Sequence, residues 1–167
     1  MNRSPGGSNS GLLGVKRRPR RNSGIMHTHV KASRSARWRD NQLVDTRPLI
    51  MISGIYCDTR YMLRVLLEMW GYRVMEAEGS NETLKYVRTR GLRMVILDTS
   101  LAFEDDLQVL REIRHSDIGG SVPVLVLTGF PQIRHRKAAF ENGATGLLVK
   151  PMDLDLLEGY LEDFIGE

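Results

Sequence analysis

Five short apolar runs alternate with five amphipathic segments between residues 48 and 167 of this 167-residue chain. Two of the runs, "MVIL" (94–97) and "VPVLVL" (122–127), contain no polar side chain, which is typical of strands that are buried on both faces. Regular alternation of strands and helices favours right-handed crossovers and a parallel sheet covered by helices on both sides. We therefore expect an α/β fold with a doubly wound five-stranded parallel sheet.

Each apolar run predicts a strand, and each amphipathic segment predicts a helix. Asp58, Ser80 and Asp153 are expected to cap three of the helices at their N-termini, and Pro131 is expected to begin a fourth. The expected strands are 49–53, 72–77, 94–98, 122–128 and 145–149, and the expected helices are 58–70, 80–90, 104–115, 131–142 and 153–164.

Charge divides the chain into two parts. Residues 1–47 contain 11 of the 24 Lys and Arg but two acids, a net charge of +9, whereas residues 48–167 have a net charge of −5. The first part is rich in Gly, Ser, Arg and Asn and has no sustained hydrophobic period, so it cannot bury enough apolar surface to offset the entropy of ordering. We expect a disordered basic tail over residues 1–47 and a folded domain over residues 48–167.

The basic stretch "KRRPRR" (16–21) allows three interpretations. It could contact the phosphates of nucleic acid or anionic lipid. A solvated arm is the simpler alternative and is preferred here. The third alternative is a misassigned start codon, because Met26 and Met51 precede or begin the folded part.

Composition places the folded part among globular proteins. The chain is 41% hydrophobic and 26% charged, and no apolar stretch approaches the roughly 18 residues that span a bilayer. The single cysteine, Cys57, excludes an internal disulfide and fits a reducing compartment. We expect a cytoplasmic chain with no transmembrane segment.

Three chemically distinct side chains follow three of the expected strands. Asp98 ends the third strand, Thr128 ends the fourth, and Lys150 follows the fifth. A doubly wound sheet binds ligands outside the carboxyl ends of its strands. A carboxylate, a hydroxyl and an ammonium are therefore expected to meet at one edge of the sheet.

This cluster has a functional and a structural interpretation. Asp98 could be a nucleophile held ionised by Lys150, and the Thr128 hydroxyl and the ammonium could then bind the oxygens of a phosphoryl group. Alternatively, Asp98 and Lys150 form a purely structural ion pair. If Asp98 is partly exposed, we expect Asp98→Asn to destabilise the fold little, whereas a loss of several kcal/mol would indicate a buried pair.

The segments "MVILDTSLAFEDDLQVLREIR" (94–114), "VPVLVLTG" (122–129) and "GATGLLVKPMDLDLLEGYL" (143–161) resemble the receiver domain of two-component response regulators. The resemblance covers residues 48–167 and implies a flavodoxin-like strand order, 2-1-3-4-5. It implies that Asp98 is the phospho-acceptor, Thr128 the switch hydroxyl and Lys150 the paired lysine, with a cis peptide bond before Pro151.

The chain departs from the family pattern at the metal site. Receiver domains usually end their first strand with two acids that hold Mg²⁺, and those positions are Gly54 and Ile55 here. Asp98 and the Ser100 carbonyl would remain as ligands, although Mg²⁺ prefers a near-octahedral set of oxygens. The resemblance therefore implies that Mg²⁺ binding is weak or absent.

Further departures concern the readout and the loop after Asp98. The aromatic switch position of the family is Leu147, and Ala102 and Asp106 replace the customary Pro and Gly of the loop. Asp58 is expected to be occupied as an N-cap. Asp105 and Asp106 could also reach the site, but we do not expect them to compensate for the missing pair. These differences predict an atypical receiver.

Two functions follow from the resemblance. The first is a stand-alone, non-enzymatic phosphorelay receiver that takes a phosphoryl group on Asp98 from a histidine kinase or phosphotransfer protein. It would signal to a downstream protein through its fourth and fifth helices, and "IRHRK" (133–137) puts basic residues on the fourth. The alternative is a phosphorylation-independent pseudo-receiver that acts as a protein-interaction module. A basic tail that tethers the domain to nucleic acid or membrane is a third and weaker interpretation. No output domain is expected after Glu167.

Overall fold

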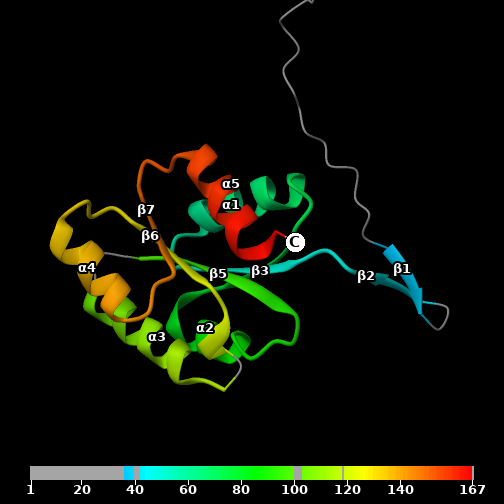
Figure 1. The fold of residues 1–167 in the computed structure, drawn as a ribbon, viewed down its shortest axis with the longest axis horizontal. Helices are drawn as coiled ribbons and strands as arrows, with labels where there is room; N and C mark the ends of the chain where they lie inside the picture. Colours follow the sequence, from blue (N-terminus) through cyan, green and yellow to red (C-terminus); the bar gives the residue numbers. More distant parts are fainter. Residues whose placement is uncertain (1–35, 40–41, 100–102, 118, 167) are drawn as a thin grey trace, which may run out of the picture.

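The computed structural model describes residues 36–39, 42–99, 103–117 and 119–166, and Figure 1 shows its fold. Strands and helices alternate from residue 49 onward, as the sequence predicts. The strands are β1 (Ala36–Arg39), β2 (Gln42–Asp45), β3 (Leu49–Ser53), β4 (Arg73–Ala77), β5 (Leu92–Asp98), β6 (Val124–Thr128) and β7 (Gly146–Val149). The helices are α1 (Cys57–Met69), α2 (Gly79–Tyr86), α3 (Phe103–His115), the short 3₁₀ turn η1 (Gly119–Ser121), α4 (Ile133–Glu141) and α5 (Leu154–Ile165).

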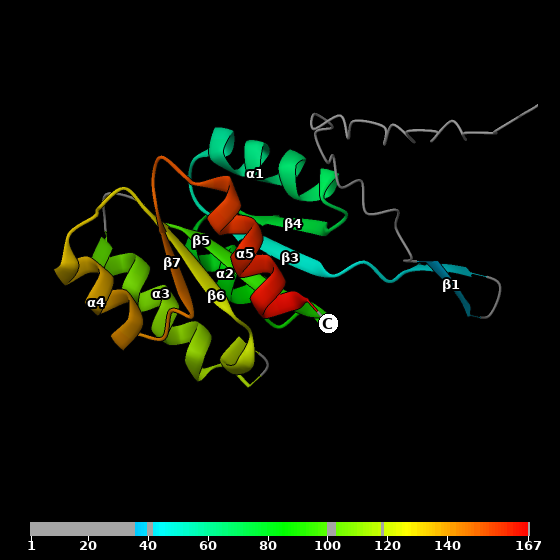
Figure 2. The same ribbon diagram turned by 45° about the horizontal axis from the view of Figure 1, so that its top comes forward.

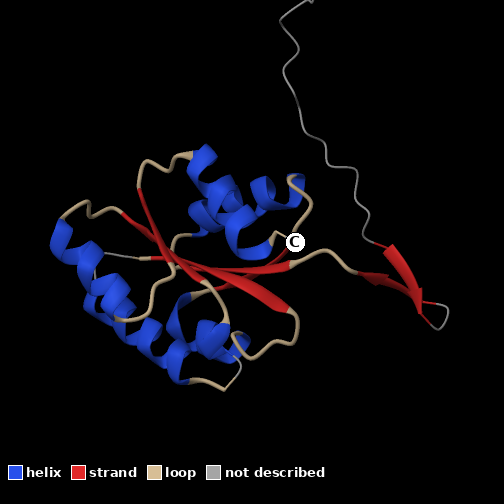
Figure 3. Ribbon diagram, in the orientation of Figure 1, coloured by secondary structure: helices blue, strands red, loops and turns tan. Residues whose placement is uncertain are grey.

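The central sheet has five parallel strands in the order β4-β3-β5-β6-β7. Counted from β3, this is the order 2-1-3-4-5, so the predicted fold class is confirmed. Figure 3 shows the five strands as one twisted layer between helices, with the β1–β2 hairpin apart from it. In Figure 2, α1 and α5 cover one face of the sheet, and α2, α3 and α4 cover the other.

Each face of the sheet buries its own apolar cluster, because successive side chains of a strand point to opposite faces. Ile50, Ile52 and Met94 pack with Leu63 of α1 and Leu157 of α5. On the other face, Leu49, Met51, Val95, Val126 and Leu147 pack with Val109, Leu110 and Ile113 of α3 and Ala139 of α4. The uninterrupted apolar runs of β5 and β6 follow from this double burial.

The helix caps agree with the sequence in one case and differ in three. Asp153 caps α5 and accepts hydrogen bonds from the backbone N–H groups of residues 155 and 156, at 3.0 and 3.2 Å. The N-cap predictions for Asp58 and Ser80 were wrong, because α1 and α2 begin one residue earlier and their N-cap residues make no side-chain cap bond. Pro131 also lies outside α4, which begins at Ile133. Asp58 still lies in the first turn of α1, where a carboxylate interacts favourably with the helix dipole.

A short hairpin precedes the folded domain. Strands β1 and β2 pair antiparallel, and their register places Ala36 opposite Asp45. The expectation that residues 1–47 lack regular structure was therefore wrong for 36–39 and 42–45, whereas residues 1–35 lie outside the described residues. The Asp45 carboxylate accepts hydrogen bonds from Arg47 and lies 3.7 Å from the Arg73 guanidinium of β4, which joins the hairpin to the sheet.

Within the described ranges, no helix is long and apolar enough to cross a membrane.

Candidate functional site

The three predicted site residues meet at the carboxyl edge of the sheet. Asp98 is the last residue of β5 and lies opposite Leu127 of β6, while Thr128 pairs with Val149 of β7 in the next ladder. Lys150 follows β7 directly, and its backbone N–H donates to the Thr128 carbonyl at 2.8 Å. The peptide bond between Lys150 and Pro151 is cis, as the resemblance implies. The sheet thus brings together residues that are up to 52 positions apart.

The Asp98 carboxylate is buried, and its two oxygens have different surroundings. The residue is 3% exposed. Its Oδ1 accepts a hydrogen bond from the Lys150 ammonium, whose side chain is 31% exposed. Its Oδ2 has no hydrogen-bond partner within the described part of the chain. Partial exposure, the condition under which Asp98→Asn was expected to destabilise the fold little, is therefore not met.

Thr128 is completely buried beside this pair. Its Oγ1 accepts a hydrogen bond from the backbone N–H of Phe130 at 3.0 Å, which fixes the turn after β6. A hydroxyl that accepts in this way still has its own proton to donate. The Thr128 hydroxyl can therefore accept the hydrogen bond from the loop and at the same time donate one to an oxygen ligand at the strand edge.

A pocket of about 160 Å³ lies next to Asp98. Its walls include Gly54 and Ile55 after β3, Ser80 of α2, and Asp105 and Asp106 of α3. The backbone at Gly54 passes so close to Asp98 that a Cβ on residue 54 would lie 2.9 Å from the Asp98 Cβ. Ile55, by contrast, is 53% exposed. The pocket therefore has room beside Ile55 but none for a side chain at position 54.

A buried arginine that the sequence analysis missed holds the strand end in place. Arg60 of α1 is 8% exposed, and its Nη1 donates to the Gly54 carbonyl at 2.6 Å. Its Nε donates to Glu76 at 3.3 Å, and its Nη2 donates to Glu78 at 3.5 Å. A signal was present, because Arg60 shares the buried stripe of α1 with Leu63 and Leu67 at helical spacing.

The described residues do not fit the three-carboxylate magnesium site of the resemblance. The unpartnered Asp98 Oδ2 is one suitable oxygen, but Gly54 and Ile55 offer no carboxylate. Asp105 and Asp106 line the same pocket, yet no three His, Cys, Asp or Glu residues of the described ranges converge closely enough to hold a metal ion. The Ser100 carbonyl, the other predicted ligand, lies outside the described residues.

Three further residues were predicted to differ from the receiver pattern, and the structure describes two of them. Leu147 of β7 is 6% exposed and packs in the apolar cluster under α3 and α4. An aliphatic side chain thus fills a position that the resemblance assigns to a mobile aromatic ring. Ala102 lies outside the described residues, and Asp106 lines the pocket from α3.

This arrangement defines a class of protein: a doubly wound domain with an acid, a hydroxyl and a lysine at the carboxyl ends of its third, fourth and fifth parallel strands. Residues 57–162 match the family described as the response regulator receiver domain. The chain belongs to this family and is a receiver domain of a two-component system.

The sequence of this chain is similar to part of the sequence of several curated relatives. The transcriptional regulatory protein ZraR of Escherichia coli O157:H7 is 34% identical over 101 residues, which are 60% of this chain and 22% of ZraR. The KDP operon transcriptional regulatory protein KdpE of E. coli K12 is 34% identical over 102 residues, 61% of this chain and 44% of KdpE. The chain thus spans about a fifth of the length of ZraR and under half that of KdpE.

Solved structures share the fold. A response regulator receiver protein from Pseudomonas putida superimposes with a TM-score of 0.65 at 24% identity, covering 72% of this chain and 99% of that one. The receiver domain of the sensor histidine kinase PA1611 from Pseudomonas aeruginosa has the same TM-score, identity and coverage. Its structure contains a magnesium ion in the active-site cleft.

Proposed function

We propose that this receiver accepts a phosphoryl group on Asp98 and passes the signal to protein partners. The observation that carries the proposal is the asymmetry of the carboxylate: Lys150 binds Oδ1, and Oδ2 beside the pocket has no partner in the described residues. An unpartnered carboxylate oxygen has its lone pairs available as a nucleophile.

The chemistry follows from this asymmetry. An Oδ2 lone pair attacks the phosphorus of a phosphohistidine, the P–N bond breaks, and the histidine nitrogen leaves with the bonding electrons. A P–Oδ2 bond forms, and Lys150 and Thr128 donate to the phosphoryl oxygens. The chain is the acceptor in this transfer, and we propose no enzymatic activity of its own.

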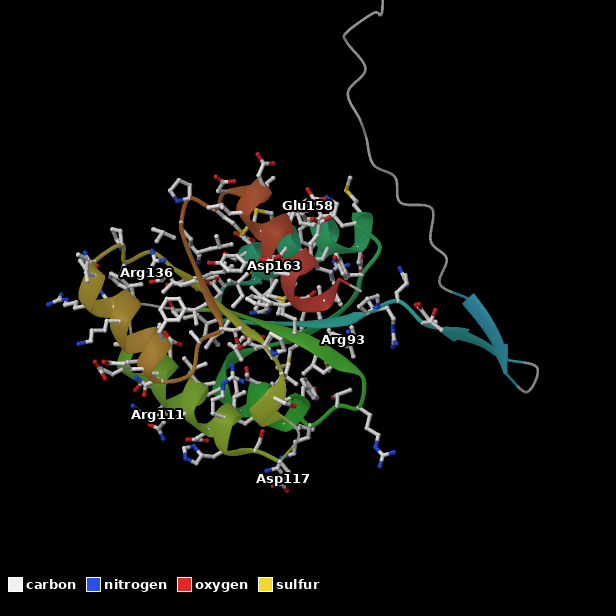
Figure 4. All side chains as sticks on the ribbon, viewed as in Figure 1. Arg93, Arg111, Asp117, Arg136, Glu158 and Asp163 are labelled. Carbon is white, nitrogen blue, oxygen red and sulfur yellow. The ribbon has the colours of Figure 1, made fainter. Side chains whose placement is uncertain are left out.

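Supply of the phosphoryl group by a histidine kinase or a phosphotransfer protein follows from the proposed chemistry. Output is proposed to go through a protein that contacts α4 and α5. Arg134, Arg136 and Lys137 give α4 an exposed basic face, and Figure 4 labels Arg136 on this helix. Such a face favours an acidic partner surface.

The test is the intact mass of the full chain after incubation with acetyl phosphate, with and without Mg²⁺. We expect a single phosphate adduct that is absent from Asp98→Asn. Thr128→Val is expected to slow formation of the adduct, and Thr128→Ser, which keeps the hydroxyl, is the matched control. An adduct that persists in Asp98→Asn contradicts the proposal.

A second function is favoured by the pocket. Without acids at positions 54 and 55, magnesium cannot neutralise phosphoryl charge in the way the resemblance implies. In that case the domain is a pseudo-receiver, and the Asp98–Lys150 pair fixes one surface for a partner. The absence of an adduct both from acetyl phosphate and from a phosphorylated histidine kinase would support this second function.

A further inference from the structure

Helix α5 carries acids and no basic residue. Asp155, Glu158, Glu162 and Asp163 are all exposed, and the capping Asp153 adds a fifth carboxylate. Figure 4 labels Glu158 and Asp163 on this helix. The opposite side of α5 is apolar and packs on the sheet through Leu157 and Leu161. The outer face of α5 is therefore a strongly negative surface.

Most of this charge is not neutralised within the folded domain. Asp155, Glu158 and Asp163 form no ion pair with any described residue, whereas Glu68 of α1 and Glu76 of β4 both pair with Arg64. Tyr72, just before β4, lies within reach of these charges: burial raises the pKa of its hydroxyl, and the charges of Glu162 and Glu158 raise it further. The face therefore suits a positively charged occupant.

The N-terminal arm is attached beside the end of this helix. A hollow of about 710 Å³ is lined by residues 45–48 and by Ile165 and Gly166 at the end of α5, together with Tyr72, Arg73, Gly91 and Arg93. Figure 1 shows the C-terminus close to the start of β3. The hairpin then brings Ala36 back beside Asp45. The described chain therefore begins, at Ala36, opposite a residue that lines the same hollow as the end of α5.

The chain preceding the hairpin has the complementary charge and enough length. Residues 1–35 contain eight Lys and Arg and no acid, and five of the eight lie in Lys16–Arg21. The 15 residues from Arg21 to Ala36 span at most about 50 Å. Helix α5, with 12 residues, is about 18 Å long. The basic segment can thus reach every acid of α5.

We propose that residues 16–21 of this same chain bind the acidic outer face of α5. The tether converts a set of individually weak surface ion pairs into an intramolecular contact at millimolar effective concentration. The contact is electrostatic and covers the side of α5 that is exposed in the folded domain. A partner that uses this face must displace the arm.

The test is paramagnetic relaxation enhancement in the full chain, with a nitroxide attached at Ser23→Cys in a Cys57→Ser background. We expect selective loss of amide signal along α5 at about 0.1 M salt. Recovery is expected at about 1 M salt, where the Debye length falls from about 10 Å to about 3 Å. The combined variant Asp155→Asn, Glu158→Gln, Glu162→Gln, Asp163→Asn is expected to restore the α5 signals.

Two controls separate this contact from its alternatives. Neutralising exposed acids of α3 (Glu104→Gln, Glu112→Gln) is expected to leave the α5 effect unchanged. A mixture of ¹⁵N-labelled unmodified chain with unlabelled nitroxide chain is expected to show no effect. Signal loss in that mixture would show that the basic segment of one molecule binds α5 of another, and it overturns the proposal. Uniform loss, or loss at α5 that survives neutralisation of its acids, overturns it as well.

Discussion

The Lys150 ammonium binds one oxygen of the Asp98 carboxylate, while the other oxygen of this buried group has no partner among the described residues. The two residues are not equivalent in burial, because the Asp98 side chain is fully buried and that of Lys150 is 31% exposed. Removing the charge of Asp98 and removing the charge of Lys150 are therefore expected to have different effects on stability. A buried carboxylate without its cation is costly, whereas an exposed ammonium can return to water.

The stability of the two single variants is expected to differ for this reason. Lys150→Met should lower the free energy of unfolding by about 2 kcal/mol, since it strands a buried anion. Asp98→Asn should change it by about 1 kcal/mol or less, because the amide keeps the shape and an acceptor for Lys150. Urea denaturation of the full chain measures both values. A loss of several kcal/mol in Asp98→Asn would show instead that the ion pair holds the sheet together.

The two positions without an acid beside Asp98 are expected to respond differently when an aspartate is introduced: Mg²⁺ binding should be gained at position 55 and not at position 54. Ile55 is exposed and lines the pocket, so Ile55→Asp adds a carboxylate without displacing a neighbour. We expect this variant to bind Mg²⁺ at least roughly tenfold more tightly than the unmodified chain, about 1.4 kcal/mol. Isothermal titration calorimetry measures the affinity, and Ile55→Asn is the uncharged control.

Gly54→Asp tests the close approach of the backbone to Asp98. Any Cβ at position 54 would lie 2.9 Å from the Asp98 Cβ, so β3 or β5 must shift to accept it. We expect this variant to lose about 1–3 kcal/mol of stability from overpacking. An unchanged free energy of unfolding together with magnesium binding as tight as that of Ile55→Asp would contradict the described geometry.

Arg60 is expected to matter more for stability than its neighbour Arg64. Arg60→Gln leaves the Gly54 carbonyl and the carboxylates of Glu76 and Glu78 without the guanidinium, and should cost about 2–3 kcal/mol. Arg64 is 35% exposed and pairs with Glu76 and Glu68, so Arg64→Gln should cost less than about 1 kcal/mol. Equal losses in thermal or urea unfolding would show that the buried hydrogen bonds of Arg60 contribute no more to stability than the surface ion pairs of Arg64.

The strands and the site edge could be predicted from the sequence because burial on both faces leaves an unbroken apolar run. Asp98 and Thr128 lie at the ends of two such runs, so the order of the parallel strands was enough to predict that they lie at the same edge of the sheet. Arg60 was missed because a charged residue in an amphipathic segment is normally solvent-facing, although its spacing from Leu63 placed it on the buried stripe. The close approach at Gly54 has no sequence signal, since it depends on how β3 sits beside β5.

The hairpin makes a prediction about pH. The hydrogen bond from the Arg47 side chain, followed by the nearby charges of Arg47 and Arg73, lowers the Asp45 pKa from 3.8 to about 2. Because the folded-state pKa is the lower one, the contribution of this contact is complete above about pH 4 and is lost as the pH falls through 2. NMR titration of the Asp45 carboxyl carbon is expected to give a midpoint of about 2, and Arg47→Gln is expected to return it towards 3.8. A midpoint near 3.8 in the unmodified chain would mean that the Arg47 guanidinium does not hold the Asp45 carboxylate in solution.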